Sequence, residues 1–224
     1  MDILIVAATS KEIEPFMKHF GMASVKNLRT GRYSQYKIDC LTAGVGMLAT
    51  TYHTTETVCK NDYDLIINAG ICGSFHNDAA LGSVVEVASE QFGDFGMDDH
   101  GIFHSVYEAN FIGRNDFPFQ DGILSNPHRH DFTDHLPKAS GITVNTASGS
   151  EERIRTIRGK FNPDIENMEG LAIFYIALQQ KISFVEIRSV SNIVEPRNRN
   201  NWNVALAIEN LNSTLIGIFE KLIS

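Results

Sequence analysis

Residues 164–192 read DIENMEGLAIFYIALQQKISFVEIRSVSN, and their pattern predicts a strand, a helix and a second strand. Apolar residues over 170–180 cover more than one face of a helix, and residues 182–190 are mostly apolar and β-branched. Such a unit is normally a right-handed parallel crossover, so we expect both strands to end at one edge of a sheet. Ligands of open α/β sheets bind outside that edge, and the predicted class is therefore α/β.

Polar side chains follow three of the expected strands. Glu169 falls in the first turn of the expected helix, where unpaired amide groups favour an ionised carboxylate. Asn192 stands where the second strand ends. Glu12 follows a buried N-terminal strand over residues 3–8, in a helix that Thr9 or Ser10 can cap and whose first turn tolerates Pro15. We expect Glu12, Glu169 and Asn192 to face one crevice.

Composition narrows the class of protein and of partner. The chain has 224 residues, 43% of them hydrophobic, and no linker or low-complexity segment, which predicts one domain over 1–224. A net charge of −8 without a basic cluster argues against nucleic acid or an anionic membrane as a partner. Three cysteines without CxxC spacing, and an N-terminal apolar run too short for a leader, favour a cytoplasmic location.

Two glycine-containing turns are candidate binding surfaces. Residues 44–46, Gly-Val-Gly, precede an expected helix over 47–60; they form either a tight turn or a cradle for an anion. Residues 70–74, Gly-Ile-Cys-Gly-Ser, end a buried strand that begins at Asp64, and small residues there let a flat ligand lie against the backbone. Ile71, Cys72 and Gly73 are the candidates. Cys72 has no neighbouring base in the sequence and reads as a packing residue.

Residues 91–135 form a long excursion with few periodic segments and several histidines, including His100, His104, His128 and His130. Imidazole and carboxylate groups are ligands for zinc or iron, so a metal site is one interpretation. The spacings match no established metal pattern, and a solvated loop is the favoured alternative. We expect no metal and no cofactor.

Two carboxylates and one amide in a crevice suit the cleavage of a glycosidic bond. Positive charge builds on the sugar ring in that reaction, and water must be activated. One carboxylate can hold sugar hydroxyls while the other takes a proton from water. An amide both donates and accepts, so Asn192 can read a ring nitrogen and an exocyclic oxygen together.

These residues resemble the purine nucleoside phosphorylase and nucleosidase superfamily. The resemblance covers almost the whole chain and lies in Asn167-Met-Glu-Gly170, Arg188-Ser-Val-Ser-Asn192, Asn68-Ala-Gly-Ile-Cys-Gly-Ser74 and Glu12. It implies a three-layer α/β/α single domain with a central mixed twisted sheet, without metal, that forms a homo-oligomer and binds a small nucleoside.

The resemblance also implies roles for single residues. Glu12 matches the water-activating carboxylate of the hydrolases, and only Lys11 is basic nearby, so hydrolysis is favoured over phosphorolysis. Met168 and Glu169 match the pair that binds ribose. The remaining matches are Arg188 and Ser191, which support the purine site, Trp202, which caps the nucleoside, and Thr146 and Ala147, which sandwich the base.

Asn192 departs from the pattern of nucleosidases that act on methylthioadenosine, which carry an aspartic acid there. An ionised aspartate would repel the O6 of a 6-oxopurine, whereas an amide can donate to O6 and accept from a protonated N7. Mispaired buried polar groups of this kind cost roughly 10- to 1000-fold in rate. The expected leaving base is hypoxanthine.

The chain is similar to the futalosine hydrolase branch of that superfamily in Thr143-Val-Asn-Thr146, Phe92-Gly-Asp-Phe-Gly96 and the segment 197–202. That branch implies hydrolysis of futalosine to hypoxanthine and dehypoxanthine futalosine in menaquinone biosynthesis. Its substrate carries a carboxyphenyl ketone at the 5′ carbon, for which Arg197, Arg199 and His100 are equal candidates. The alternatives are a methylthioadenosine/adenosylhomocysteine-type nucleosidase, an inosine phosphorylase, and a nucleoside-binding relative without catalysis.

Overall fold

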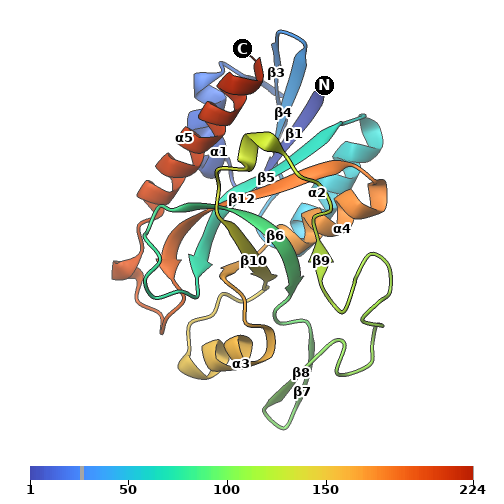
Figure 1. Cartoon of the computed structure of the whole chain (residues 1–224), viewed down its shortest axis with the longest axis vertical. Coiled ribbons are helices and arrows are strands. Elements are labelled where there is room, and N and C mark those ends of the chain that lie inside the picture. Colours follow the sequence, from blue (N-terminus) through green and yellow to red (C-terminus); the bar gives the residue numbers. More distant parts are fainter. Residues whose placement is uncertain (26–27, 224) are drawn as a thin grey trace.

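A computed structural model describes residues 1–25 and 28–223, and it shows one α/β domain with a mixed sheet between two helical layers (Figure 1). The strand order is β11-β10-β6-β12-β5-β1-β4-β3-β2. The main strands are β1 (Asp2–Ala7), β4 (Tyr36–Thr42), β5 (Leu65–Ser74), β6 (Val84–Phe92), β10 (Lys138–Thr143), β11 (Ile165–Asn167) and β12 (Ser183–Ile193), with β2 (Ala23–Val25) and β3 (Leu28–Tyr33) at one edge.

Strand direction divides the sheet into two parts. β4, β1, β5 and β12 are parallel, so their carboxyl ends lie together. β6 runs antiparallel to β12, and β10 and β11 follow the direction of β6. β11 also pairs antiparallel with β5, through Glu166 opposite Gly73, and this pairing closes β5, β12, β6, β10 and β11 into a ring.

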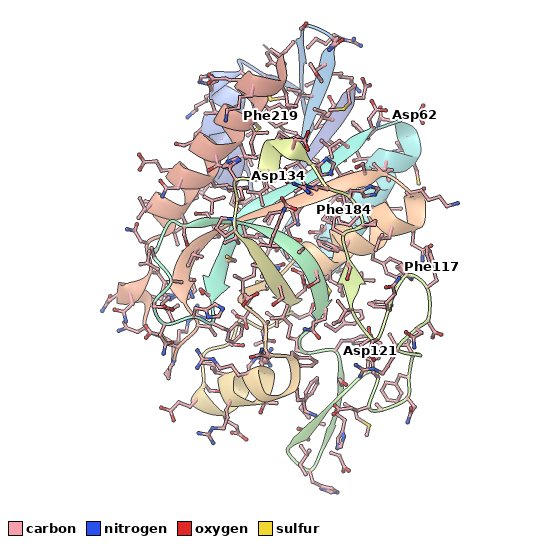
Figure 2. All side chains as sticks on the ribbon, in the orientation of Figure 1. Asp62, Phe117, Asp121, Asp134, Phe184 and Phe219 are labelled. Carbon is pink, nitrogen blue, oxygen red and sulfur yellow. The ribbon has the colours of Figure 1, made fainter. Side chains whose placement is uncertain are left out.

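The helices cover the sheet in the expected three-layer arrangement. On one face lie α1 (Ser10–His19) and α5 (Val204–Ile223), and on the other lie α2 (Met47–Lys60) and α4 (Gly170–Gln180). α3 (Glu151–Phe161) packs Ile154 and Ile157 in one apolar cluster with Ile142 and Val144, at the carboxyl end of β10. In Figure 2, Phe219 of α5 and Phe184 of β12 lie on the two packed faces, where they contact Phe16 and Phe174 respectively.

The excursion after β6 holds short elements and carries exposed apolar side chains. It contains β7 (Gly96–Asp99), β8 (Ile102–Ser105), β9 (Leu124–Ser125) and η1 (Asp131–Thr133). β7 and β8 form a separate hairpin that projects from the body of the molecule (Figure 1). Phe117, labelled in Figure 2, is 69% exposed.

Three local expectations were wrong. β11 and β12 do not form a parallel crossover, because β11 closes the ring antiparallel to β5, to which β12 is parallel. Residues 70–74 continue β5 as a strand and do not form a turn. Pro15 lies beyond the first turn of α1, where a proline disrupts the regular hydrogen bonds of a helix. Nearby backbone groups of α1 therefore need hydrogen-bond partners from elsewhere in the protein.

Asn212 of α5 supplies those partners. Its Oδ1 accepts from the Phe16 amide at 2.9 Å, and its Nδ2 donates to the Glu12 carbonyl at 2.8 Å. Asn212 is 2% exposed, so it replaces an internal α1 hydrogen bond in a site without solvent. The side chain thereby connects the C-terminal helix to the turn that carries Glu12.

Asn212→Leu should therefore lower the free energy of unfolding by roughly 2–4 kcal/mol, because two buried backbone groups lose their partners. Urea denaturation measures this change. Asn210, on the same helix, makes one side-chain bond, to the Gly82 carbonyl, and Asn210→Leu should cost about 1 kcal/mol. Equal losses in the two variants would contradict the role given to Asn212.

Candidate active site

A cavity of about 320 Å³ opens where β1, β5 and β12 end. It is lined by Ala8, Thr9, Lys11, Glu12, Val45, Ile71, Cys72, Gly73, Ala147, Ser148, Glu166, Asn167, Met168, Glu169, Ser191, Asn192, Trp202, Val204 and Ile208. A larger hollow of about 780 Å³ lies beside α3. None of the carboxylates lining that larger hollow is buried, so the smaller cavity is the candidate active site.

Glu12 enters the cavity from the first turn of α1. Its Oε2 accepts from the amide and hydroxyl of Thr9, at 2.8 and 2.9 Å, and its Oε1 accepts from the Ile71 amide at 3.3 Å. The side chain is buried, and burial raises its pKa above the ordinary value, against the opposing effect of the Arg188 charge and of the Thr9 hydrogen bonds. A carboxylate with a raised pKa is suited to take a proton from water.

Glu169 caps α4 and does not lie inside its first turn as expected. Its Oε1 accepts from the Gly46 amide at 2.9 Å, and its Oε2 lies 3.5 Å from Arg188 Nη1. The turn before it is fixed by Asn167, whose Oδ1 accepts from the amides of Glu169 and Gly170. Residues 44–46 therefore bind a carboxylate of the protein itself, through one glycine amide.

Arg188 lies behind the cavity wall, 1% exposed. Its Nε donates to Glu186 Oε1 at 2.7 Å, its Nη1 faces Glu169, and its Nη2 lies 3.4 Å from Asn167 Oδ1. The surrounding carboxylates raise its pKa further despite the opposing effect of burial, so the guanidinium stays charged. Arg188 does not line the cavity, and its effect on the site passes through Glu169 and Asn167.

Asn192 and Ser191 form a polar pair beside Gly73. The Ser191 hydroxyl lies 2.8 Å from Asn192 Oδ1 and 3.0 Å from the Cys72 carbonyl, and Asn192 Nδ2 donates to the Ile193 carbonyl at 3.0 Å. These bonds set the orientation of the amide. One Nδ2 hydrogen and one Oδ1 lone pair remain for a ligand.

The structure brings together most of the other predicted residues. Ile71, Cys72, Gly73, Ala147, Met168 and Trp202 line the cavity. Thr146 is exposed outside it, where its amide binds Asp94 and its carbonyl binds Arg153. Trp202 follows the short helix η2 (Arg199–Asn201) and precedes α5. It is therefore not part of α5, and it lines the cavity.

The cations considered for the 5′ substituent differ in position. Arg197 does not line the cavity, but its guanidinium carbon lies 5.4 Å from the centre of the Trp202 ring, which does. His100 sits in the β7–β8 hairpin with a side chain 97% exposed. Lys11, which the sequence relates only to phosphate binding, lines the cavity itself.

Sequence reasoning did not find Glu166 or Ser148. Glu166 lines the cavity from β11, and its carboxylate accepts from the amide and the hydroxyl of Ser148. Burial raises the pKa of Glu166, against the Ser148 hydrogen bonds. No sequence pattern marks Glu166 as a cavity residue. Its side chain faces the cavity because β11 pairs with β5 and closes the ring of strands.

Within residues 1–25 and 28–223, no group of three or more histidine, cysteine, aspartate or glutamate side chains is arranged to hold a metal ion. Over the same part of the chain, no helix has the length and apolar character needed to cross a membrane.

Comparison with known proteins gives the family. A futalosine hydrolase of Streptomyces coelicolor is 25% identical over 224 aligned residues, covering 93% of this chain and 91% of the relative. A 5′-methylthioadenosine/S-adenosylhomocysteine nucleosidase of Colwellia psychrerythraea is 24% identical, covering 77% of this chain and 73% of the relative.

The solved structures agree in fold. The futalosine hydrolase of Helicobacter pylori strain 26695 superposes with a TM-score of 0.82 at 14% identity, covering 99% of this chain and 98% of that one. A family model described as the Phosphorylase superfamily matches residues 2–224. Because that match spans the fold and every residue of the cavity, the chain belongs to the Phosphorylase superfamily.

Proposed function

We propose that this protein hydrolyses the N-glycosidic bond of a purine nucleoside. The observation that carries the proposal is the pairing of two buried carboxylates in one cavity. Glu12 has a raised pKa, and its Oε1 accepts a hydrogen bond from the Ile71 amide of β5. Glu169 forms an ion pair with Arg188. The relatives named as nucleosidases support this reaction class.

In the proposed reaction, water attacks the anomeric carbon of the ribose while the bond to the base breaks. Glu12 takes the proton of the attacking water, and the leaving base keeps the electrons of the broken bond. Glu169 holds the ribose hydroxyls and, as an anion, stabilises the positive charge that develops on the ring. The base leaves neutral because it gains a proton at N7 from solvent water, and the proton that Glu12 takes from the attacking water, and later returns to solvent, balances it.

Hydrolysis fits the cavity better than phosphorolysis. Phosphate would need cations and amide donors where water is expected. Among the described residues that line the cavity, Lys11 is the only lysine or arginine, and the Gly46 amide is occupied by Glu169. Thr9 and Ile71 direct their amides at Glu12, so these donors too are used within the protein.

We further propose that the leaving base is hypoxanthine. Asn192 is neutral, and its oriented amide offers one donor and one acceptor to the base. A 6-oxopurine presents O6 as an acceptor beside N7, which complements this arrangement. A methylthioadenosine-type activity is the second candidate, favoured by the relative from Colwellia psychrerythraea.

The proposed substrate is futalosine, which would place the enzyme in menaquinone biosynthesis. Futalosine hydrolases among the relatives support this assignment. Its 5′ carboxylate needs a cation near the cavity; Lys11 lines the cavity, and Arg197 lies against Trp202, which lines it. The cytoplasm as the place of action, and a homo-oligomer as the active form, belong to the same proposal.

The direct test incubates the purified protein with futalosine, inosine or methylthioadenosine, with and without phosphate. Chromatography should detect free hypoxanthine from futalosine at the same rate in both conditions, because water is the acceptor. Release of adenine from methylthioadenosine as the faster reaction would support the second candidate. A requirement for phosphate would contradict hydrolysis.

Glu12→Gln should lower kcat by about 10²–10⁴-fold with little change in substrate affinity, because the amide keeps the shape of the side chain and cannot take a proton. Single-turnover kinetics and a binding titration separate the two effects. Glu14→Gln is the matched control, because Glu14 is exposed on the same helix and pairs with Lys18. A wild-type rate in Glu12→Gln would remove Glu12 from the mechanism.

Asn192→Asp should shift the ratio of kcat/KM for hypoxanthine and adenine nucleosides toward adenine by roughly 10- to 1000-fold, because a carboxylate repels O6. Parallel assays on inosine and adenosine measure the ratio. Asn201→Asp serves as the control, since Asn201 is exposed and bonds to Glu195. An unchanged ratio in Asn192→Asp would show that the amide does not read the base.

A further inference from the structure

Two further carboxyl groups lie immediately behind the site and take no part in the mechanism above. Glu90 of β6 and Glu186 of β12 are both 0% exposed. Their oxygens crowd the same space beside Gly170, where an added Cβ would overlap Glu90 Oε1 and both oxygens of Glu186. A glycine at position 170 is therefore required by the approach of these two side chains.

The hydrogen-bond partners of the two groups differ. Glu90 accepts from the Thr143 hydroxyl at 2.8 Å and from Asn167 Nδ2 at 2.5 Å, and both of these donors are neutral. Glu186 Oε1 accepts from the Arg188 guanidinium, whereas Glu186 Oε2 is buried and forms no regular hydrogen bond with a described residue. The neutral Asn68 amide, opposite Glu186 in the β5–β12 register, is a further side-chain donor that lowers the pKa of Glu186. An orphaned acceptor beside a second carboxyl group is the place for a proton.

Charge balance requires such a proton. Among the described residues, Glu12, Glu90, Glu169 and Glu186 all interact electrostatically with the Arg188 cation. Cys72 of β5 is the other titratable group nearby, and burial raises its pKa to about 12, so it is neutral. Two ionised carboxylates in contact without water repel strongly, and one of them retains its proton. Within the described part of the chain, Glu90 forms no ion pair, and its hydrogen-bond donors are Thr143 and Asn167.

We propose that Glu90 and Glu186 form a buried acid–carboxylate pair that holds one proton, with Glu90 as the neutral partner, and that this pair positions Arg188 and Asn167 behind the ribose-binding Glu169. The proton lies between Glu90 and the unpaired Glu186 Oε2. Burial and the Glu186 charge raise the pKa of Glu90 well above its ordinary value of 4.5, in agreement with this assignment.

The pair reaches the site by two routes. Glu186 fixes Arg188 through Nε, which leaves Nη1 for Glu169. Glu90 fixes the Asn167 amide, whose oxygen holds the backbone amides of Glu169 and Gly170. Glu90 and Glu186 are therefore positioning residues. Their effect on turnover rests on the proposed function, whereas their protonation does not.

The first test uses activity. Glu90→Gln keeps a neutral side chain with a donor and an acceptor, so kcat should stay within about threefold of wild type. Glu90→Ala removes the partner of Asn167, and kcat should fall more than tenfold with a smaller change in KM, because Glu169 acts mainly in the transition state. Rescue by glutamine and not by alanine distinguishes a neutral acid from a carboxylate.

The second test uses stability and needs no substrate. Between pH 4.5 and the raised folded-state pKa of Glu90, the folded wild type binds a proton that the unfolded chain has lost, so wild-type stability falls as pH rises. Glu90→Gln lacks this loss. Its melting temperature relative to wild type should therefore increase by several degrees from pH 4.5 to pH 8.

The third test detects the proton directly. Infrared spectroscopy at pH 7 should show the carbonyl stretch of a protonated carboxylic acid in wild type and should lose that band in Glu90→Gln. Glu86→Gln is the control, because Glu86 is equally buried on β6 but pairs with Lys138 at 2.5 Å; the band and the activity should remain.

Several results would overturn the proposal. Glu90→Gln could be destabilised equally at every pH, lose as much activity as Glu90→Ala, or keep the acid band; each outcome would show that Glu90 is ionised. If no nucleoside is cleaved, the proposed function fails, and the band and the pH dependence of stability still decide the protonation of Glu90.

Discussion

The site depends on one buried cation. Arg188 lies in the middle of β12 with 1% of its surface exposed, and removing a guanidinium from water costs several kcal/mol unless partners surround it. Glu186 on the same strand, Glu169 at the cap of α4 and the Asn167 amide supply those partners. The charge that would destabilise an ordinary strand therefore fixes the geometry of the carboxylate proposed to hold ribose.

Space for this cation comes from glycines on the neighbouring elements. Gly70 stands opposite Arg188 in the β5–β12 register, and an added Cβ there would overlap Nη1. Gly170 leaves room for Glu90 and Glu186 in the same way. Glycine weakens a strand interior, so its presence at position 70 is explained by the side chain that lies over it. Gly70, which belongs to the stretch first expected to let a flat ligand lie against the backbone, thus makes room for a charged side chain of the protein itself.

Sequence patterns predicted the α/β class and the principal carboxylates, because both depend on local periodicity and on where strands end, whereas the three layers were implied by the family resemblance. The class, the helices at 10–19, 47–60 and 170–180, and the convergence of Glu12, Glu169 and Asn192 agree with the structure. Strand direction was not predictable in the same way. β11 has three residues, and its antiparallel pairing with β5 is decided by closure of the ring and not by its own sequence.

The same ring closure explains why some of the site escaped prediction. Glu166 faces the cavity only because it stands opposite Gly73, and Glu90 meets Glu186 only because β6 and β12 are antiparallel neighbours. These contacts join residues 93 and 96 positions apart, which no local period reveals. Asn212 of α5 is a similar case, since it bonds to the backbone of α1 beside Pro15, almost two hundred positions earlier in the chain.

Electrostatics gives the buried acid pair a consequence for catalysis. A ribose that gains positive charge is stabilised by negative charge nearby, and each added carboxylate would strengthen that effect at the expense of folding. With Glu90 neutral, the charge of Glu186 is balanced by Arg188, and the charge of Glu169 remains directed at the substrate. Ionisation of Glu90 would add negative charge that no cation balances and would draw Arg188 away from Glu169. The proposed proton would therefore let one arginine hold Glu169, the carboxylate proposed to bind ribose, without leaving an unbalanced negative charge in the core.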